Sequence, residues 1–132
     1  MARIQHIALS VPDPEKAAQF YETTFGLKRV GETHSPLADG VYLTDGVVNL
    51  AFLKYRTSEA AGTERGKDYV GVHHFGIQVE DLDESGKKIE ERGGSFFMDL
   101  PTDKSTLDYE AKYRDPFGVI FDISHKGWTL GK

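Results

Sequence analysis

An internal repeat limits the possible folds of this chain more than any other feature of its sequence. Residues 6–13 read His-Ile-Ala-Leu-Ser-Val-Pro-Asp, and residues 74–81 read His-Phe-Gly-Ile-Gln-Val-Glu-Asp. The second segment begins 68 residues after the first, which is about half of the 132-residue chain. Matching segments at this spacing predict two copies of one supersecondary unit that share a core.

Both segments are predicted to be strands, because large apolar residues alternate with other residues along them. The alternation gives each strand one large apolar face, which suits packing against a helix. The opposite face carries a histidine followed by small or polar residues, namely His6, Ala8 and Ser10 in the first copy and His74, Gly76 and Gln78 in the second. A face of this kind is suited to lining a cavity.

The remaining elements follow the same order in both copies. In the first copy, Asp13 is the expected N-cap of a helix that runs to Phe25, and strands are expected at residues 27–32, 41–44 and 47–54. In the second copy, a helix ends near residues 93–94, and strands are expected at residues 95–98, 109–114 and 119–124. We therefore predict an α+β fold of two βαβββ units, residues 1–54 and 72–132, in one structural domain. Residues 55–71 form a linker that can also act as a flap.

Composition excludes several classes of site. The chain has no cysteine, so it has neither disulfides nor thiolate ligands for a metal. Its 21 acidic residues outnumber its 16 basic residues, which argues against a nucleic-acid-binding surface. No apolar stretch approaches the length of a membrane span. A cytoplasmic location is the default expectation.

The sequence resembles the vicinal-oxygen-chelate superfamily, which includes glyoxalases, bleomycin-resistance proteins and extradiol dioxygenases. The resemblance rests on the strand starts at His6 and His74, the Val-Pro-Asp and Val-Glu-Asp exits, and the Asp-Pro-Phe-Gly turn at residues 115–118. It covers residues 1–125 and implies a curved, partly closed mixed sheet with the helices outside. It also implies a divalent metal ion bound by His6, His74 and Asp122, where Asp122 replaces the glutamate that is usual in the family.

The residues themselves favour this ligand set. The two histidines occupy equivalent repeat positions on the face expected to line a cavity, and two imidazoles with one carboxylate form a facial triad with open coordination positions. Asp122 lies between Phe121 and Ile123 in an apolar strand, where an unpaired carboxylate would be costly to bury. A metal ion removes that cost, and so would a salt bridge to a neighbouring arginine or lysine.

Two tyrosines are candidate catalytic residues. Tyr109 and Tyr113 share a face of one predicted strand, and either phenol could assist proton transfer if that face lines the cavity. The alternative is that both rings fill the core. Glu110 points away from the tyrosines, and we expect it to be solvated or ion-paired. The other histidines are expected on the surface or in packing roles: His34, His73 and His125.

The resemblance implies an enzyme that acts on a small substrate with two adjacent oxygens. Glyoxalase I and methylmalonyl-CoA epimerase take a fourth ligand, Glu or Gln, from the strand that corresponds to residues 47–53, where Asn49 is the only polar residue. A three-ligand site makes an extradiol-type dioxygenase the best guess, with Fe(II) as first choice of metal and Mn, Ni, Zn or Co as others. That strand also lacks the acid–base histidine expected of ring-cleaving dioxygenases.

Two other functions remain open at this point. The first alternative is a glyoxalase-type lyase or an epimerase. The second is a metal-free small-molecule (antibiotic) binding protein. The presence of His6, His74 and Asp122 at all three ligand positions counts against it. The resemblance also implies a homodimer, since sheet edges of such a unit pair can be covered by a partner. The site could then lie within one chain or between two chains.

Overall fold

The structure, a computed structural model, describes residues 1–99 and 110–131. Its strands pair in both parallel and antiparallel fashion, so the sheet is mixed. The chain forms two compact units. Unit 1 comprises residues Met1–His6 and His74–Trp128, and unit 2 comprises residues Ile7–His73 with the tail from Thr129. The predicted α+β class and mixed sheet are confirmed, and the repeat boundaries at residues 54 and 72 stay a prediction.

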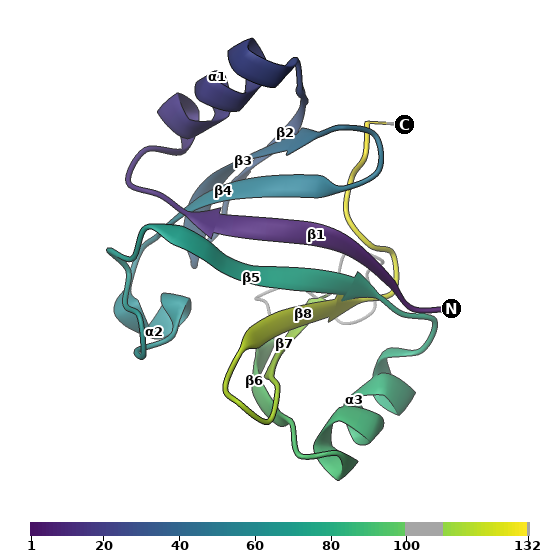
Figure 1. Cartoon of the computed structure of the whole chain (residues 1–132). Helices are drawn as coiled ribbons and strands as arrows, with labels where there is room; N and C mark the ends of the chain where they lie inside the picture. The colour runs from purple at the N-terminus through teal and green to yellow at the C-terminus, as the bar shows by residue number, and fades with distance from the viewer. Residues whose placement is uncertain (100–109, 132) are drawn as a thin grey trace. The chain divides into compact units, whose positions relative to one another are not determined.

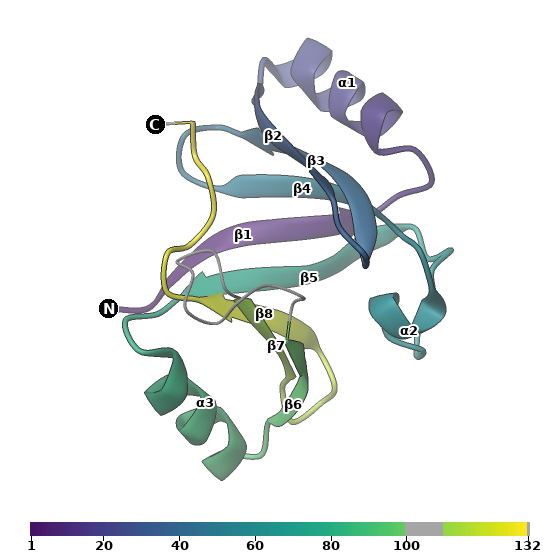
Figure 2. The same cartoon turned by 180° about the vertical axis from the view of Figure 1, so that it is seen from behind.

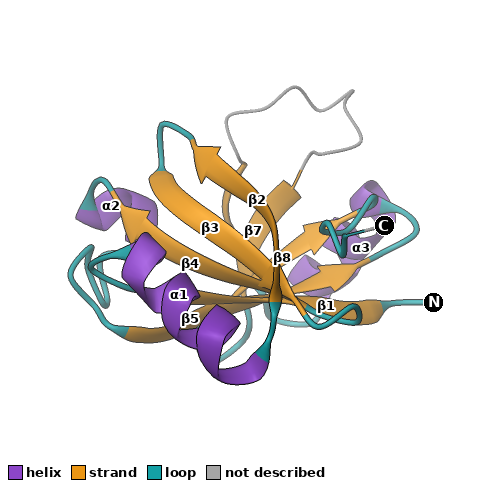
Figure 3. Ribbon diagram, turned by 90° about the horizontal axis from the view of Figure 1, so that it is seen from above, coloured by secondary structure: helices purple, strands orange, loops and turns teal. Residues whose placement is uncertain are grey.

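Unit 2 contains a helix that packs on an antiparallel hairpin of strands. Its elements are the second half of β1 (Arg3–Ser10), α1 (Pro14–Phe25), β2 (Lys28–His34), β3 (Ala38–Thr44), β4 (Asn49–Tyr55) and α2 (Ser58–Ala61) (Figure 1). The Asp13 side chain accepts a hydrogen bond from the Lys16 N–H, and Gly26 ends α1 at a φ of 73°, as the sequence predicted. Helix α1 packs on β3 and β4 (Figure 3). Its core cluster consists of Ala18, Val41, Leu43 and Phe52.

Helix α2 is an element that the sequence analysis missed. It falls within the predicted linker, residues 55–71, and has only four residues. The Thr57 side chain caps it by accepting a hydrogen bond from the Ala60 N–H, and Ala60 and Ala61 are buried. Such a short helix has no periodic pattern to detect, so packing rather than propensity determines it.

Unit 1 contains the second half of β5 (Gly71–Gln78), α3 (Leu82–Glu91), β6 (Ser95–Asp99), β7 (Glu110–Arg114) and β8 (Ile120–Ser124). Strand β8 lies between β5, to which it is parallel, and β7, to which it is antiparallel (Figure 2). The apolar face of these strands packs with α3 in a core of Val79, Ala111, Tyr113, Phe121 and Ile123, with Phe75, Ile77, Leu82 and Ile89 at its margin. The predicted contact between the apolar strand face and the helix is therefore confirmed in this unit.

No helix in residues 1–99 and 110–131 is long and apolar enough to cross a membrane. The cytoplasmic location and the homodimer stay predictions.

His34 lies at the end of β2, opposite Asp39 on β3. Its ring nitrogens lie 2.9 Å from Asp39 Oδ1 and 3.3 Å from Glu32 Oε2. Hydrogen bonds to Asp39 and then Glu32 raise the pKa of His34 above its ordinary value. The protonated imidazole therefore stabilises the fold fully below the unfolded pKa near 6.5, and this contribution is lost as the pH rises through the folded pKa.

We expect Asp39→Asn to lower the pKa of His34 more than Glu32→Gln does, because Asp39 makes the larger contribution. An NMR titration of the His34 ring protons measures both shifts. Equal midpoints in the wild type and the Asp39→Asn variant would contradict the assignment of this pair.

Candidate metal centre

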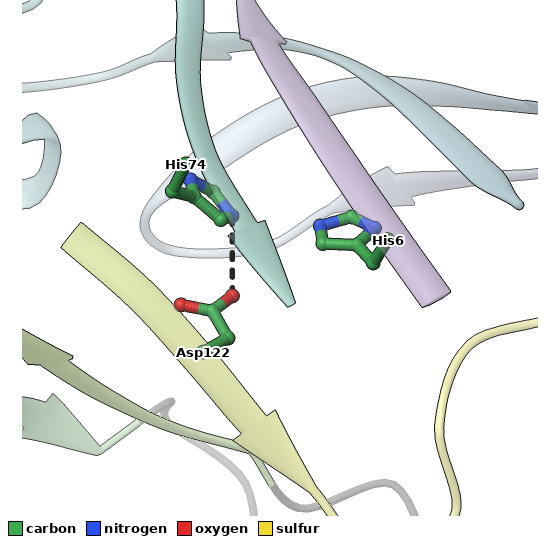
Figure 4. Close-up of side chains that lie close together, drawn as sticks. All are labelled: His6, His74 and Asp122. Carbon is green, nitrogen blue, oxygen red and sulfur yellow. Dashed lines mark ion pairs between the residues drawn. The ribbon is translucent and has the colours of Figure 1, made fainter. Parts of the chain in front are cut away.

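Three buried polar side chains converge in unit 1. They are His6 of β1, His74 of β5 and Asp122 of β8, and all three are at most 3% exposed. Each offers one ligand atom, and these atoms lie within 4.8 Å of one another. Figure 4 shows the ion pair between His74 and Asp122, with the His6 ring beside it. The three ligands predicted from the sequence are therefore brought together.

Strand register explains why His74 and Asp122 meet. Gly76 of β5 is paired with Asp122 of the parallel strand β8, and His74 lies two residues before Gly76 on the same face. The intervening residue, Phe75, points to the opposite face and joins the margin of the core under α3. The alternation read from the sequence thus separates the polar cluster from the apolar core.

The donor set fits a divalent metal ion. His74 Nε2 lies 3.1 Å from Asp122 Oδ2. Adjacent donors around an octahedral ion with bonds of about 2.1 Å are roughly 3 Å apart, so this separation already suits two neighbouring coordination positions. The His6 and His74 ring centroids are 5.4 Å apart, so both imidazoles are close enough to bind one ion. Two imidazole nitrogens and a carboxylate oxygen suit Fe, Mn, Co, Ni or Zn.

Lys112 of β7 is a further member of the cluster. It is directly opposite Asp122 in the antiparallel β7–β8 pair, and its side chain is 5% exposed. Its Nζ donates to Asp122 Oδ1 at 2.8 Å and to Oδ2 at 2.9 Å. Burial by itself would raise the pKa of Asp122, but the charges of His74 and Lys112 outweigh it and hold that pKa well below its ordinary range.

Glu110 also faces this cluster. It lies two residues before Lys112 on the same face of β7, and it is partly buried. Burial and then the charge of Asp122 raise its pKa to about 8, and the charge of Lys112 opposes the shift. As predicted, Glu110 lies on the face of β7 away from Tyr113. Of the two roles expected for it, solvated or ion-paired, the solvated one is not found, because Glu110 lies beside Asp122 and the charge of Lys112.

Trp128 covers His6. The indole and imidazole rings are stacked with centroids 4.7 Å apart and an angle of 4° between the planes. The Trp128 backbone N–H donates to Gln5 Oε1 at 2.9 Å, which holds the segment after β8 against β1. A Cβ added at Gly76 would collide with the indole ring and lie 3.0 Å from His6 Cβ, so this close approach requires glycine.

Tyr113, one of the two predicted catalytic tyrosines, does not lie at the cluster. Tyr113 faces the opposite side of β7, where it is buried and stacks near Phe121 at a centroid distance of 6.2 Å. A Cβ added at Gly86 of α3 would lie only 2.5 Å from the Tyr113 hydroxyl oxygen, so the phenol packs tightly on that helix. This position favours the alternative given above, in which the Tyr113 ring fills the core. Tyr109 lies outside the described residues.

Asn49, the polar residue on the strand that supplies a fourth ligand in some relatives, belongs to unit 2. It is 1% exposed, and its Nδ2 donates to the Thr129 carbonyl oxygen at 2.9 Å. Its amide therefore helps to hold the C-terminal tail of that unit.

Comparison with known proteins gives a match to one family model and to several curated relatives. The family model of the glyoxalase/bleomycin resistance protein/dioxygenase superfamily matches residues 3–123. A lactoylglutathione lyase of Arabidopsis thaliana is 24% identical over 96% of this chain and 45% of its own length. The mitochondrial methylmalonyl-CoA epimerase of Homo sapiens is 34% identical over 62% of this chain and 49% of its own length. The chain thus spans about half the length of these curated relatives.

Solved structures show the same fold. A methylmalonyl-CoA epimerase of Streptomyces coelicolor, in complex with 2-nitronate-propionyl-CoA, has a TM-score of 0.73 and 23% identity, and the match covers 92% of this chain and 94% of that one. A hypothetical protein from Bacillus halodurans C-125 has a TM-score of 0.75 and 21% identity, with 97% and 96% covered. At these identities the likeness establishes the fold alone.

Proposed function

Because the chain belongs to the glyoxalase/bleomycin resistance protein/dioxygenase superfamily, we propose that it is a metal-dependent lyase or epimerase acting on a small substrate with two adjacent oxygens. The relatives named above are a lactoylglutathione lyase and methylmalonyl-CoA epimerases. They support the alternative that the sequence analysis raised, and they give no support to its first choice, an extradiol dioxygenase. Fe(II) is therefore no longer preferred over Zn, Ni, Co or Mn as the bound metal.

One observation carries this proposal, namely the convergence of His6, His74 and Asp122 within 4.8 Å in a buried site. These three residues would hold the metal ion, the two histidines as neutral imidazoles and Asp122 as a carboxylate. A divalent ion held there would supply positive charge to stabilise the negative oxygen that develops when a proton leaves the carbon next to a carbonyl.

The surrounding residues would orient the ligands and handle the proton. The stacked Trp128 ring limits rotation of the His6 imidazole and keeps water from one of its faces. The Glu110 side chain is hydrogen-bonded to both Asp122 and Trp128, on the side of β7 that faces the ligands. A proton on a Glu110 carboxylate oxygen would therefore lie beside the site, and we propose Glu110 as the acid–base group in place of the two tyrosines.

The relatives also suggest a substrate class. Lactoylglutathione and methylmalonyl-CoA are both thioesters that carry a second oxygen-bearing group on the carbon next to the thioester carbonyl. We propose that this chain acts on a thioester of the same kind, by removing and returning the proton on that carbon.

The test is proton exchange in D2O. The chain is stripped with EDTA, dialysed, reloaded with one of the five metals and incubated with methylmalonyl-CoA or lactoylglutathione. We expect deuterium on the carbon next to the thioester carbonyl, incorporated at roughly 100-fold or more above the uncatalysed rate with at least one metal. Mass spectrometry measures this incorporation. Chelation should abolish the exchange.

Other outcomes would contradict the proposal in different ways. Oxygen consumption with catechols in the absence of exchange would restore the dioxygenase interpretation. If the chain showed no proton exchange and bound no metal, the metal-free binding protein would be favoured.

A further inference from the structure

Lys112 brings a positive charge to the same carboxylate that the proposed metal ion would use. Its Nζ contacts both Asp122 oxygens, at 2.8 and 2.9 Å, and neither side chain is more than 5% exposed. Charge-assisted hydrogen bonds of this length are strong, and the low local dielectric strengthens them further. In the structure, therefore, the carboxylate is already neutralised by a residue of the chain itself.

Strand geometry keeps Lys112 in this position. The two residues are register partners in the β7–β8 pair, and Ala111 and Tyr113 on either side of Lys112 are anchored in the core under α3. A buried ammonium is costly without an anionic partner, so Lys112 depends on Asp122 as much as Asp122 depends on Lys112. A divalent ion that bound Asp122 would have to displace at least one of the two hydrogen bonds and bring its charge close to the ammonium.

We propose, on the basis of the function proposed above, that Lys112 is an internal competitor for the metal ion. In the metal-free state, its ammonium occupies both oxygens of Asp122. If a metal ion took one oxygen of Asp122, the ammonium would lose that hydrogen bond, and the side chain of Glu110, on the same face of β7, would be an alternative acceptor. The chain therefore binds its metal more weakly than its ligand set alone would allow, and it stays folded when the metal leaves.

The experiment compares metal affinities of the stripped full-length chain. Co²⁺ is titrated into the wild type, Lys112→Met, which keeps the volume but not the charge, and Lys112→Gln, which keeps a hydrogen-bond donor. Absorption of the bound Co²⁺ is the readout. We expect both variants to bind Co²⁺ roughly ten- to a hundredfold more tightly than the wild type, as loss of a charge-assisted pair implies.

Lys87→Met serves as the matched control, because it removes the same charge from an exposed position on α3 of the same unit. We expect its affinity to change less than about twofold, since an exposed charge is screened by solvent and salt. The double variant Lys112→Met/His74→Ala should lose the gained affinity, which locates the tighter binding at this site. Thermal unfolding with and without Co²⁺ shows whether each variant is folded, and the rise in Tm on metal addition should be larger for Lys112→Met than for the wild type.

The outcomes separate this inference from the proposed function. Equal affinity of the wild type, Lys112→Met and Lys112→Gln, with loss in His74→Ala, would overturn the competition and leave the metal site standing. Tight binding by Lys112→Met with none by the wild type would support the competition, but overturn the metal-dependent function of the native chain. No binding by any variant would overturn both.

Discussion

His74→Ala is expected to lower the affinity of the chain for a divalent metal ion by at least about a hundredfold, and to abolish metal-dependent proton exchange. His74 supplies the donor that lies 3.1 Å from Asp122 Oδ2. Its loss leaves one imidazole and one carboxylate, too few protein ligands for tight binding. Even changes outside the ligand shell of a metal site cost roughly 10- to 100-fold in affinity, so removal of a ligand costs more.

Metal content by inductively coupled plasma mass spectrometry, on protein equilibrated with limiting Zn²⁺, measures this effect. His125→Ala is the control, because His125 is an exposed histidine of the same unit that follows β8. It should retain the metal content of the wild type. If His74→Ala and the wild type were equally rich or equally poor in metal, the assignment of His74 as a ligand would fail.

Asp122→Leu is expected to destabilise the metal-free chain by about 3–5 kcal/mol, because it leaves the Lys112 ammonium buried without its partner. Loss of the Asp122 charge removes one of the causes that raise the pKa of Glu110, so this neighbour of Lys112 ionises more readily and compensates in part, which favours the lower end of this range. The double variant Asp122→Leu/Lys112→Met replaces the ion pair by two apolar side chains. It should recover most of the lost stability, since a buried pair can often be replaced by apolar residues at little cost.

Urea unfolding at pH 7 in the presence of EDTA gives the free energy of unfolding for the wild type, both single variants and the double variant. The interaction between Lys112 and Asp122 is obtained from the resulting double-mutant cycle. A double variant as unstable as Asp122→Leu would show that the loss comes from poor packing of leucine, and not from the unpaired ammonium.

The repeat made the metal ligands predictable, because equal positions in two copies imply equal faces of two strands. His6 and His74 could be placed on the cavity face without knowing how the strands pair. Asp122 followed from its distance to the Asp-Pro-Phe-Gly turn at residues 115–118. The same alternation fixed the apolar face under α3, which the core of unit 1 confirms.

Alternation alone could not show which face of β7 contacts the ligands, so it left the role of Tyr113 open between catalysis and core packing. The tight turn before β8 determines which face this is, because it sets the register that pairs Lys112 with Asp122 across the two strands. A lysine between Ala111 and Tyr113, opposite a carboxylate in an apolar strand, was the signal for the ion pair. The apolar surroundings of Asp122 indicated a neighbouring basic residue in general terms, but they did not identify Lys112.

Trp128 could not be predicted, since the tail after β8 has no periodic pattern and its position depends on contacts made 123 residues away at Gln5. The type of reaction could not be predicted from individual residues either. The absence of a fourth ligand at Asn49 favoured dioxygenase chemistry, whereas the relatives point to lyases and epimerases.

The stacking of Trp128 on His6 gives the protein a built-in optical reporter. The chain contains a single tryptophan, so indole emission excited at 295 nm arises from this ring alone. A paramagnetic ion bound beside His6 would quench that emission, and a diamagnetic one would change it through the charge on the neighbouring imidazole. Occupancy of the centre can therefore be followed in solution, without labels, from the fluorescence of the native chain.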